Sequence, residues 1–408
     1  MEIDRRGLLA LLAGAAAVPL MPVRALAADP SDWTALLAEA KGQTVWFHAW
    51  GGGDQINDYI GWAAGEVKQR YGVTVEHVKV TDTANVVQTV LAEKSAGRTT
   101  GGSVDLVWIN GENFAAMKRE GLLQRRGWAE SLPNFAFVDV AGKPTTRVDF
   151  TIPTDGLEAP WGMAQLVFFH DTATTPNPPR SAAEFLAYAK ANPGRLAYPQ
   201  PPDFMGSTFL KQILTETTSD PVRLARPVEA GDLEEVTRPL YAYLDDLHPH
   251  LWRSGRAYPQ NVAALMQLLA DDEIDVAFAF NPATASNDVE NGVLPDSVRG
   301  YVFAGGTIGN THFVAIPFNS GAAAGAMVFA DFLMSPEAQA RKADAVVWGD
   351  PTVLDVARLG EADRARFAGI TRGVATPTAE ELGTVLPEPH PSWMEAVETA
   401  WTARYGAT

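Results

Sequence analysis

The sequence predicts an α/β protein built from two domains. Runs of β-branched and aromatic residues alternate with runs in which apolar residues recur at helical spacing, and this alternation continues through almost the whole chain. Roughly 380 of the 408 residues remain after an N-terminal export segment, which is more than one hydrophobic core usually accommodates. The chain has no cysteine, so burial of apolar surface must stabilise it without disulfides.

The first half of the chain predicts a parallel sheet with crossover helices. Strands are expected over residues 44–50, 73–80 and 104–109, and helices over 56–71, 86–96 and 114–122. Gly72 is expected to end the first of these helices. Parallel neighbours need such long connections, because a tight hairpin turn joins only antiparallel strands.

The second half continues the alternation with more helices. Strands are expected over 165–170, 196–199, 275–280 and 311–318, and helices over 182–191, 207–217, 233–247, 261–270 and 322–334. Ser335 and Pro336 are expected to stop the last of these helices. A final helix with Trp393 and Trp401 should follow a proline-rich break.

Residues 1–28 predict an export signal. Arg5 and Arg6 precede an uncharged run from residue 8 to 23, and a small-x-small pattern predicts cleavage after Ala27 or Ala28. The paired arginines favour the twin-arginine route over the general secretory route. The run is shorter than the roughly 20 residues that span a bilayer, so it does not predict a membrane anchor. The mature protein is therefore expected in the periplasm.

The formal net charge is -17. This sign argues against nucleic acid or an anionic membrane as a partner, and it mildly favours cationic ligands. Solubility alone also explains an acidic chain, so the charge does not choose a ligand.

Polar and aromatic residues follow the predicted strands, at the strand ends where ligands bind in open parallel sheets. Turn and helix-cap chemistry explains any single one of these loops, but several loops on one edge favour a binding site. The candidate ligand-binding residues are Trp50, Gly52, Asp54, Gln55, Asp82, Thr83, Asn110, Glu112, Asn113, Trp161, Asp203, Phe204, Ser207 and Asn281.

Two ligand chemistries are compatible with these loops. The three glycines 51–53 precede a helix and leave amide groups free for an anionic or strongly polar group. Alternatively, aromatic and acidic side chains can form a cage for an organic cation. The members of that cage would be Trp50, Trp161, Phe204 and Trp348 with Asp54, Asp82, Glu112, Asp203 and Asp350. For any one tryptophan, a place in the core is the competing interpretation.

Catalysis, metal binding and cofactors find little support. The seven histidines are scattered and form no recognised zinc spacing, and the chain contains no Gly-x-Ser-x-Gly elbow. We therefore expect no enzyme activity, no metal and no cofactor.

Several motifs resemble a family. They are residues 104–111 (VDLVWING), 159–162 (APWG), 272–282 (DEIDVAFAFNP) and 329–339 (FADFLMSPEAQ). Together they resemble the extracellular solute-binding proteins of bacterial ABC importers. Within that superfamily the chain is most similar to the YnjB type, related to the group that binds thiamine, polyamines and ferric iron.

The resemblance implies a two-lobed, type II-like periplasmic binding protein with hinge strands between the lobes. Residues 29–159 and 312–350 would form lobe 1, residues 160–311 lobe 2, and 351–408 a helical tail packed on lobe 2. It also implies a monomeric receptor that captures a small polar solute, for instance a thiamine-like organic cation, and delivers it to an inner-membrane ABC permease. Tyr241 and Tyr243 would lie on different helix faces, which argues against a ferric site. A secreted glycan-acting hydrolase, a carbohydrate-binding protein and an exported scaffold without ligand are the alternatives.

Overall fold

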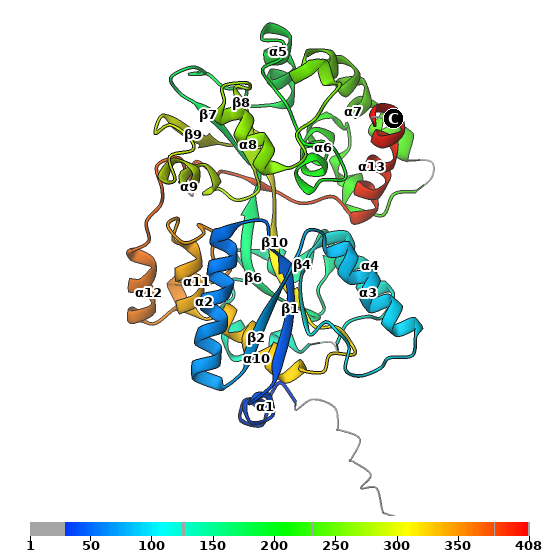
Figure 1. Cartoon of the computed structure of the whole chain (residues 1–408). Helices are drawn as coiled ribbons and strands as arrows, with labels where there is room; N and C mark the ends of the chain where they lie inside the picture. Colours follow the sequence, from blue (N-terminus) through cyan, green and yellow to red (C-terminus); the bar gives the residue numbers. More distant parts are fainter. Residues whose placement is uncertain (1–28, 125–126, 230–231, 379, 407–408) are drawn as a thin grey trace, which may run out of the picture.

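Two lobes lie one above the other and are joined by extended segments (Figure 1). The computed structural model describes residues 29–406 apart from 125–126, 230–231 and 379. The predicted export signal, residues 1–28, lies outside the described residues. Among the helices that are described, none combines the length and the apolar character needed to cross a membrane.

The sheet of lobe 1 is mixed. Its strands are β1 (Thr44–Trp50), β2 (Thr74–Val80), β3 (Leu106–Ile109), β6 (Glu158–Gln165), β10 (Thr307–Ala315) and β11 (Val385–Leu386), in the order β11-β10-β3-β1-β2 with β6 beside β10. β1 pairs in parallel with β2 and β3, as the sequence predicts. β10, which comes late in the chain, runs antiparallel to its neighbours β3 and β6, and this makes the sheet mixed. β4 (Val148–Asp149) and β5 (Ile152–Pro153) form a separate small hairpin.

Helices cover this sheet and build the core of lobe 1. They are α1 (Trp33–Ala40), α2 (Asp54–Tyr71), α3 (Thr83–Ser95), α4 (Gly111–Arg119), α10 (Ala323–Leu333), α11 (Pro336–Ala343) and α12 (Glu361–Ala368). Gly72 ends α2 as predicted, because its φ of 71° is left-handed and suits glycine. Helix α10 is buried along its whole length and packs against α1 and α2.

Lobe 2 is built around an antiparallel sheet. β7 (Val167–Asp171) is its central strand, with β8 (Val276–Ala279) on one side and β9 (Val298–Tyr301) on the other. Around it pack α5 (Ala182–Ala191), α6 (Phe204–Thr217), α7 (Leu233–Leu247), α8 (Val262–Ala270), α9 (Thr284–Glu290) and α13 (Pro391–Tyr405). Of the strand expected over 196–199, a single bridge between Leu196 and Val276 forms.

Short 3-10 helices occupy several loops. They lie at Ala129–Ser131, Pro133–Phe137, Pro144–Arg147, Pro221–Ala225, His248–His250, Trp252–Gly255 and Val356–Arg358.

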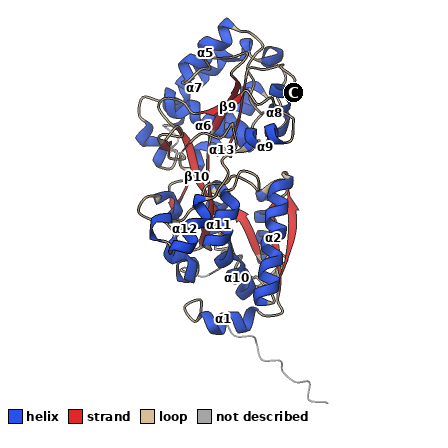
Figure 2. Ribbon diagram, turned by 90° about the vertical axis from the view of Figure 1, so that its left-hand side faces the viewer, coloured by secondary structure: helices blue, strands red, loops and turns tan. Residues whose placement is uncertain are grey.

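The C-terminal tail divides between the lobes, which corrects the expectation that all of 351–408 packs on lobe 2. Val353, Leu354 and Leu359 are buried in the core of lobe 1, and α12 contacts α11. Only after α12 does the chain return to lobe 2, where Trp393 and Trp401 of α13 join the core (Figure 2).

Candidate functional site

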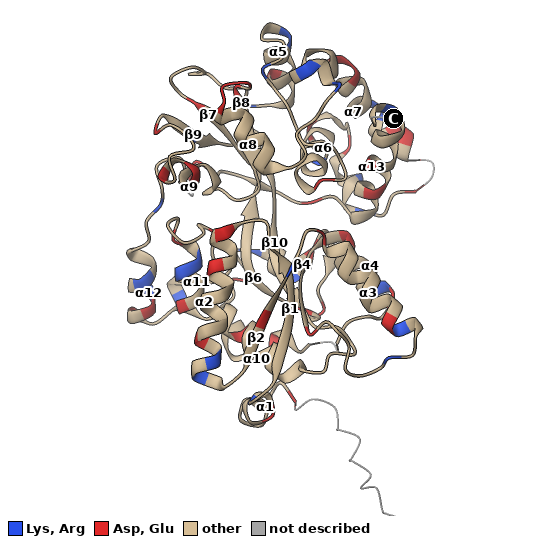
Figure 3. Cartoon of the chain, viewed as in Figure 1, with Lys and Arg blue, Asp and Glu red and all other residues tan. Residues whose placement is uncertain are grey.

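The two lobes meet where α4 of lobe 1 contacts α13 of lobe 2. Acidic positions lie at the end of α4 that faces the upper lobe and on α13 opposite it (Figure 3). A second contact joins the lobes at Asn281, whose Nδ2 donates to the carbonyl oxygen of Trp348 at 3.1 Å. The candidate site is therefore built from helix ends of both lobes.

The start of α4 places two carboxylates side by side. Gly111 has a left-handed φ of 56°, and a ring carbon of Phe150 lies 2.8 Å from the position that a Cβ would take, so only glycine fits here. Its backbone N–H donates to Oδ2 of Asp149 at 2.7 Å. Glu112 follows in the first turn of the helix, while the Nδ2 of Asn110 donates to the carbonyl oxygen of Thr311 at 2.6 Å.

Lys211 of α6 lies in a small cage of one acid and two rings. Its Nζ is 2.7 Å from Oε2 of Glu388, and both side chains are only 2 % exposed. The same ammonium lies 4.6 Å from the ring centroid of Phe150 and 5.5 Å from that of Phe204. A desolvated ammonium over ring faces gains electrostatic energy from both rings.

Carboxylates outnumber this lysine. Burial raises the pKa of Glu112 to about 7 and raises the pKa of Asp149, Glu388 and Glu398 above their usual values, while Lys211 lowers each of the four. Burial also raises the pKa of Glu158, and neighbouring Asp149 raises it further. Both carboxyl oxygens of Glu158 are buried and have no hydrogen-bond partner among the described residues. Additional positive charge would stabilise the ionised forms of these acids.

The N-terminus of α6 completes the site from lobe 2. Asp203 caps this helix by accepting from the backbone N–H of Met205 at 2.9 Å. Ser207 donates its hydroxyl to Glu398, and the ring of Phe204 is 41 % exposed. Phe204 and Ser207 therefore lie beside the acids, whereas the oxygen of Asp203 is used in capping.

Comparison with known proteins identifies the family. Residues 62–366 match the family model described as bacterial extracellular solute-binding protein. The chain belongs to this family. It is also 46 % identical to the YnjB protein of Escherichia coli (strain K12) over 387 residues, which covers 95 % of this chain and 97 % of that protein. This finding confirms the resemblance that the sequence motifs indicate.

Solved structures with low sequence identity confirm the two-lobed fold of this solute-binding protein. The TpPotD lipoprotein of Treponema pallidum superposes with a TM-score of 0.64 at 14 % identity, covering 88 % of this chain and 98 % of that one. The periplasmic binding protein AfuA of Actinobacillus pleuropneumoniae, with fructose-6-phosphate bound, gives a TM-score of 0.61 at 14 % identity over 90 % of this chain and 99 % of that one.

Trp161 belongs to a second cage, which is occupied by the ammonium of Lys342. The indole is completely buried in lobe 1, 5.0 Å from the ring of Trp108 and 5.4 Å from that of Trp348. The Nζ of Lys342 lies 3.8 Å from its ring centroid and 2.5 Å from Oδ2 of Asp350. This corrects the expectation that Trp161 faces a solute, since the core interpretation matches its position.

The remaining candidates lie at helix starts of lobe 1. Asp82 caps α3 by accepting from Ala84 N–H at 2.8 Å, and its charge raises the pKa of Glu398, which places it near the site. Thr83 donates its hydroxyl to the Trp108 carbonyl at 3.3 Å, and Asn113 donates to Glu112 at 3.1 Å.

The end of β1 is more open. Trp50 is 36 % exposed, and its ring lies 2.3 Å from the position of a Cβ at Gly52, so the indole covers that glycine. Asp54 is exposed and Gln55 is partly buried at the start of α2. No described contact links these four residues to Lys211 or its acids.

Sequence reasoning missed Asp149, Lys211, Glu388 and Glu398. None of them directly follows a predicted strand, so position after a strand does not locate them. Lys211 carried a usable signal, since it interrupts the apolar run Phe209, Leu210, Ile213 and Leu214 of α6, all of which are buried. A lysine is rarely buried in such a face unless a carboxylate pairs with it.

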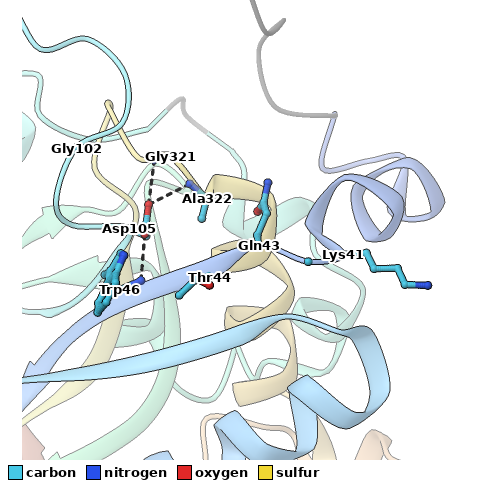
Figure 4. A pocket seen from close by; sticks show the side chains of 9 residues that line it. Lys41, Gln43, Thr44, Trp46, Gly102, Asp105, Gly321 and Ala322 are labelled. Atoms are coloured by element: carbon cyan, nitrogen blue, oxygen red, sulfur yellow. Dashed lines mark hydrogen bonds between the residues drawn. The ribbon is translucent and has the colours of Figure 1, made fainter.

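A shallow pocket at the far end of lobe 1 is distinct from this site. Lys41, Gln43, Trp46 and Asp105 are among its lining residues (Figure 4). One oxygen of Asp105 accepts from the backbone N–H groups of Gly321 and Ala322, at 2.9 and 3.0 Å, at the start of α10. Its carboxylate is thus used to hold the fold together.

Proposed function

We propose that this chain is a periplasmic, non-enzymatic receptor that binds a small organic cation between its lobes and delivers it to an inner-membrane ABC permease. A thiamine-like cation is one member of this class. The receptor acts as a monomer and binds no nucleic acid.

The observation that carries the proposal is the excess of carboxylates around Lys211. Glu112 and Asp149 of lobe 1, Glu388 of the segment after β11 and Glu398 of lobe 2 all interact with one ammonium. Burial disfavours the ionised form of each of these acids, and the single ammonium of Lys211 offsets this cost only in part. A cationic solute supplies the missing charge, and Phe204 offers it an exposed ring face.

Closure of the lobes follows from the same charges. A solute shifts the balance between open and closed lobes only if it binds the closed form more tightly. A cation that contacts acids of both lobes meets this requirement, because only closure brings the acids of the two lobes close to one another. Two structural neighbours have polyamine-related names: TpPotD, and the spermidine/putrescine substrate-binding protein PotD of Streptococcus pneumoniae (TM-score 0.58, 13 % identity, covering 90 % of this chain and all of that one). These names are compatible with a cationic solute.

A thermal-shift screen with calorimetry tests the proposal. Thiamine, spermidine and choline form one panel, and glucose, a glycan fragment and fructose 6-phosphate form the other. We expect one cation to raise the melting temperature saturably, to reduce the radius of gyration, and to be recovered unchanged. A Glu398→Gln variant should bind it more weakly than the parent, whereas Glu234→Gln, an exposed substitution in the first turn of α7, should not.

Other outcomes of that screen contradict the proposal in distinguishable ways. Stabilisation by a sugar or sugar phosphate alone would reject the cationic class. Consumption of a glycan would instead favour the hydrolase.

Export is tested separately in cells. Replacing Arg5 and Arg6 with lysine should leave uncleaved precursor in the cytoplasm if the twin-arginine route is used. Normal maturation of the double variant would reject that route while leaving periplasmic export intact.

A further inference from the structure

Lys211 connects the two lobes through one ammonium group. It projects from α6 of lobe 2, and its ion pair with Glu388 lies at the chain segment that follows β11. Its Nζ also faces the ring of Phe150, 4.6 Å away, in the β4–β5 hairpin beside α4 of lobe 1. Separating the lobes would therefore break the contact between this ammonium and Phe150.

Phe150 is held in place for this contact. Phe150 and Thr151 have left-handed φ values of 41° and 70°, which are unfavourable for residues with a side chain. Such strain persists only where the surroundings fix it, and it is concentrated at functional positions. The close approach of the ring to Gly111 and its 3 % exposure supply that restraint.

Lys211 pairs with Glu388, and its charge acts on acids from three further segments. Glu112 belongs to α4, Asp149 to β4, Glu388 to the segment after β11 and Glu398 to α13. Each of them feels the positive charge of Lys211. Without this charge, acids of the two lobes would repel one another when the lobes approach.

We propose that Lys211 is an internal counter-ion that links the two lobes, and that a cationic solute competes with its ammonium for the same carboxylates and ring faces. The competition rests on the proposed function, whereas the link between the lobes does not. Lys211 thus sets two properties of the receptor: the closed fraction of the solute-free protein and the affinity of the site for cations.

A truncation with chemical rescue tests this role. Lys211→Ala should increase the radius of gyration of the solute-free protein, because the acids lose their counter-ion and the lobes separate. We expect the closed-to-open ratio to fall at least tenfold, which is about 1.4 kcal/mol. n-Propylammonium fits the space left by the truncated side chain, so it should restore the parent radius and raise the melting temperature saturably.

Matched controls separate this effect from general damage. Lys190 also lies on lobe 2 and pairs with Asp246 at 2.5 Å, but both side chains are exposed to solvent, so Lys190→Ala should keep the parent radius. Sodium chloride at equal ionic strength should not replace n-propylammonium, and the amine should change the radius of Lys211→Ala more than that of the parent.

A second variant decides the case if Lys211→Ala fails to fold. Phe150→Leu keeps every charge but removes the ring that Lys211 faces across the lobes, and it should increase the radius by a smaller amount. The inference is overturned if the folded variants keep the parent radius, or if the amine acts equally on parent and Lys211→Ala.

These results are independent of the solute screen. A rescued Lys211→Ala with no cation bound by the parent would support the link and reject the cationic solute. If the parent binds a cation but both variants keep the parent radius, the cationic solute would be supported and the link through Lys211 rejected.

Discussion

The protein contains two lysine cages that use the same chemistry in different balance. In lobe 1, Lys342 has one acid, Asp350, and the rings of Trp161 and Trp348. Between the lobes, Lys211 pairs with Glu388 and lies over the rings of Phe150 and Phe204, and its charge also acts on three further acids, Glu112, Asp149 and Glu398. One cage is matched in charge, and the other is not.

The pKa values reflect this difference. Burial alone would raise the pKa of Asp350, but Lys342 and His312 outweigh it, so its pKa lies below the usual value. Burial lowers the pKa of Lys342 to about 8. At Lys211 the balance is opposite, since burial keeps the pKa of Glu388 above its usual value despite the ion pair. A buried acid whose charge is balanced by a lysine stabilises the fold. A group of acids with too little positive charge nearby is suited to bind a cation.

The largest effect is expected from Trp161→Ala in the matched cage. The substitution removes a fully buried indole and uncovers Lys342, and truncation of a core tryptophan costs about 3 to 5 kcal/mol. Urea unfolding should show this loss, while Phe204→Ala in the other cage should cost less, about 1 kcal/mol, because that ring is already 41 % exposed. If Trp161→Ala kept the parent stability but lost solute binding, Trp161 would belong to the ligand site.

The sequence predicts the strands and helices more accurately than it predicts the candidate binding site. Strand 44–50 and the helices 182–191 and 233–247 have the predicted bounds, because their periodicity is set by local burial. Strand direction was harder to predict, since the antiparallel β7 to β9 pairings depend on contacts far apart in the chain.

Position after a strand selects part of the candidate site for a physical reason. Asn110 and Glu112 lie at the start of α4, and Phe204 and Ser207 lie in the first turn of α6, so the end of a strand or loop locates them in the sequence. Glu388 and Glu398 come from the tail, 177 and 187 residues beyond Lys211, and only tertiary packing brings them to it. Trp161 was misplaced because a tryptophan beside a turn has the same local sequence whether it faces solvent or the core.

A smaller effect tests the unmatched cage by pH. Glu112 has its pKa raised from 4.5 to about 7, so the folded protein holds this proton while the unfolded chain releases it. Stability due to this group therefore falls as pH rises from about 4.5 to about 7 and stays level outside that window. Because Glu112 is partly exposed, we expect about 1 to 3 kcal/mol.

Melting curves of parent and Glu112→Gln across this pH range measure the effect. Burial lowers the pKa of His248 to about 4, so this group removes stability as pH falls below about 6.5, but it does so in both proteins. Their difference isolates Glu112. Parallel pH profiles of the two proteins would show that the pKa of Glu112 is not raised. They would contradict the interpretation that the acids around Lys211 lack positive charge.

Phe204→Ala is expected to weaken solute binding by about 2- to 5-fold. A ring face over an exposed cation contributes about 0.5 to 1 kcal/mol, and Phe204 is 41 % exposed. Calorimetry with the solute found in the screen measures the change, and Phe204→Tyr, which keeps the ring, is the control. Equal losses in both variants would mean that shape, and not the ring face, matters at this position.

The smallest effect is expected at Asp54, the acid that sequence position placed in the site beside Glu112. Both residues lie in the first turn of a helix of lobe 1. Asp54 is exposed to solvent, whereas Glu112 is partly buried and faces Lys211. Charges in water are screened within about 8 Å at physiological ionic strength, so Asp54→Asn should change solute affinity less than about twofold. Calorimetry at low and physiological salt distinguishes the two acids: a loss that matches Glu112→Gln and persists in salt would extend the binding site to α2 and remove the distinction between buried and exposed acids.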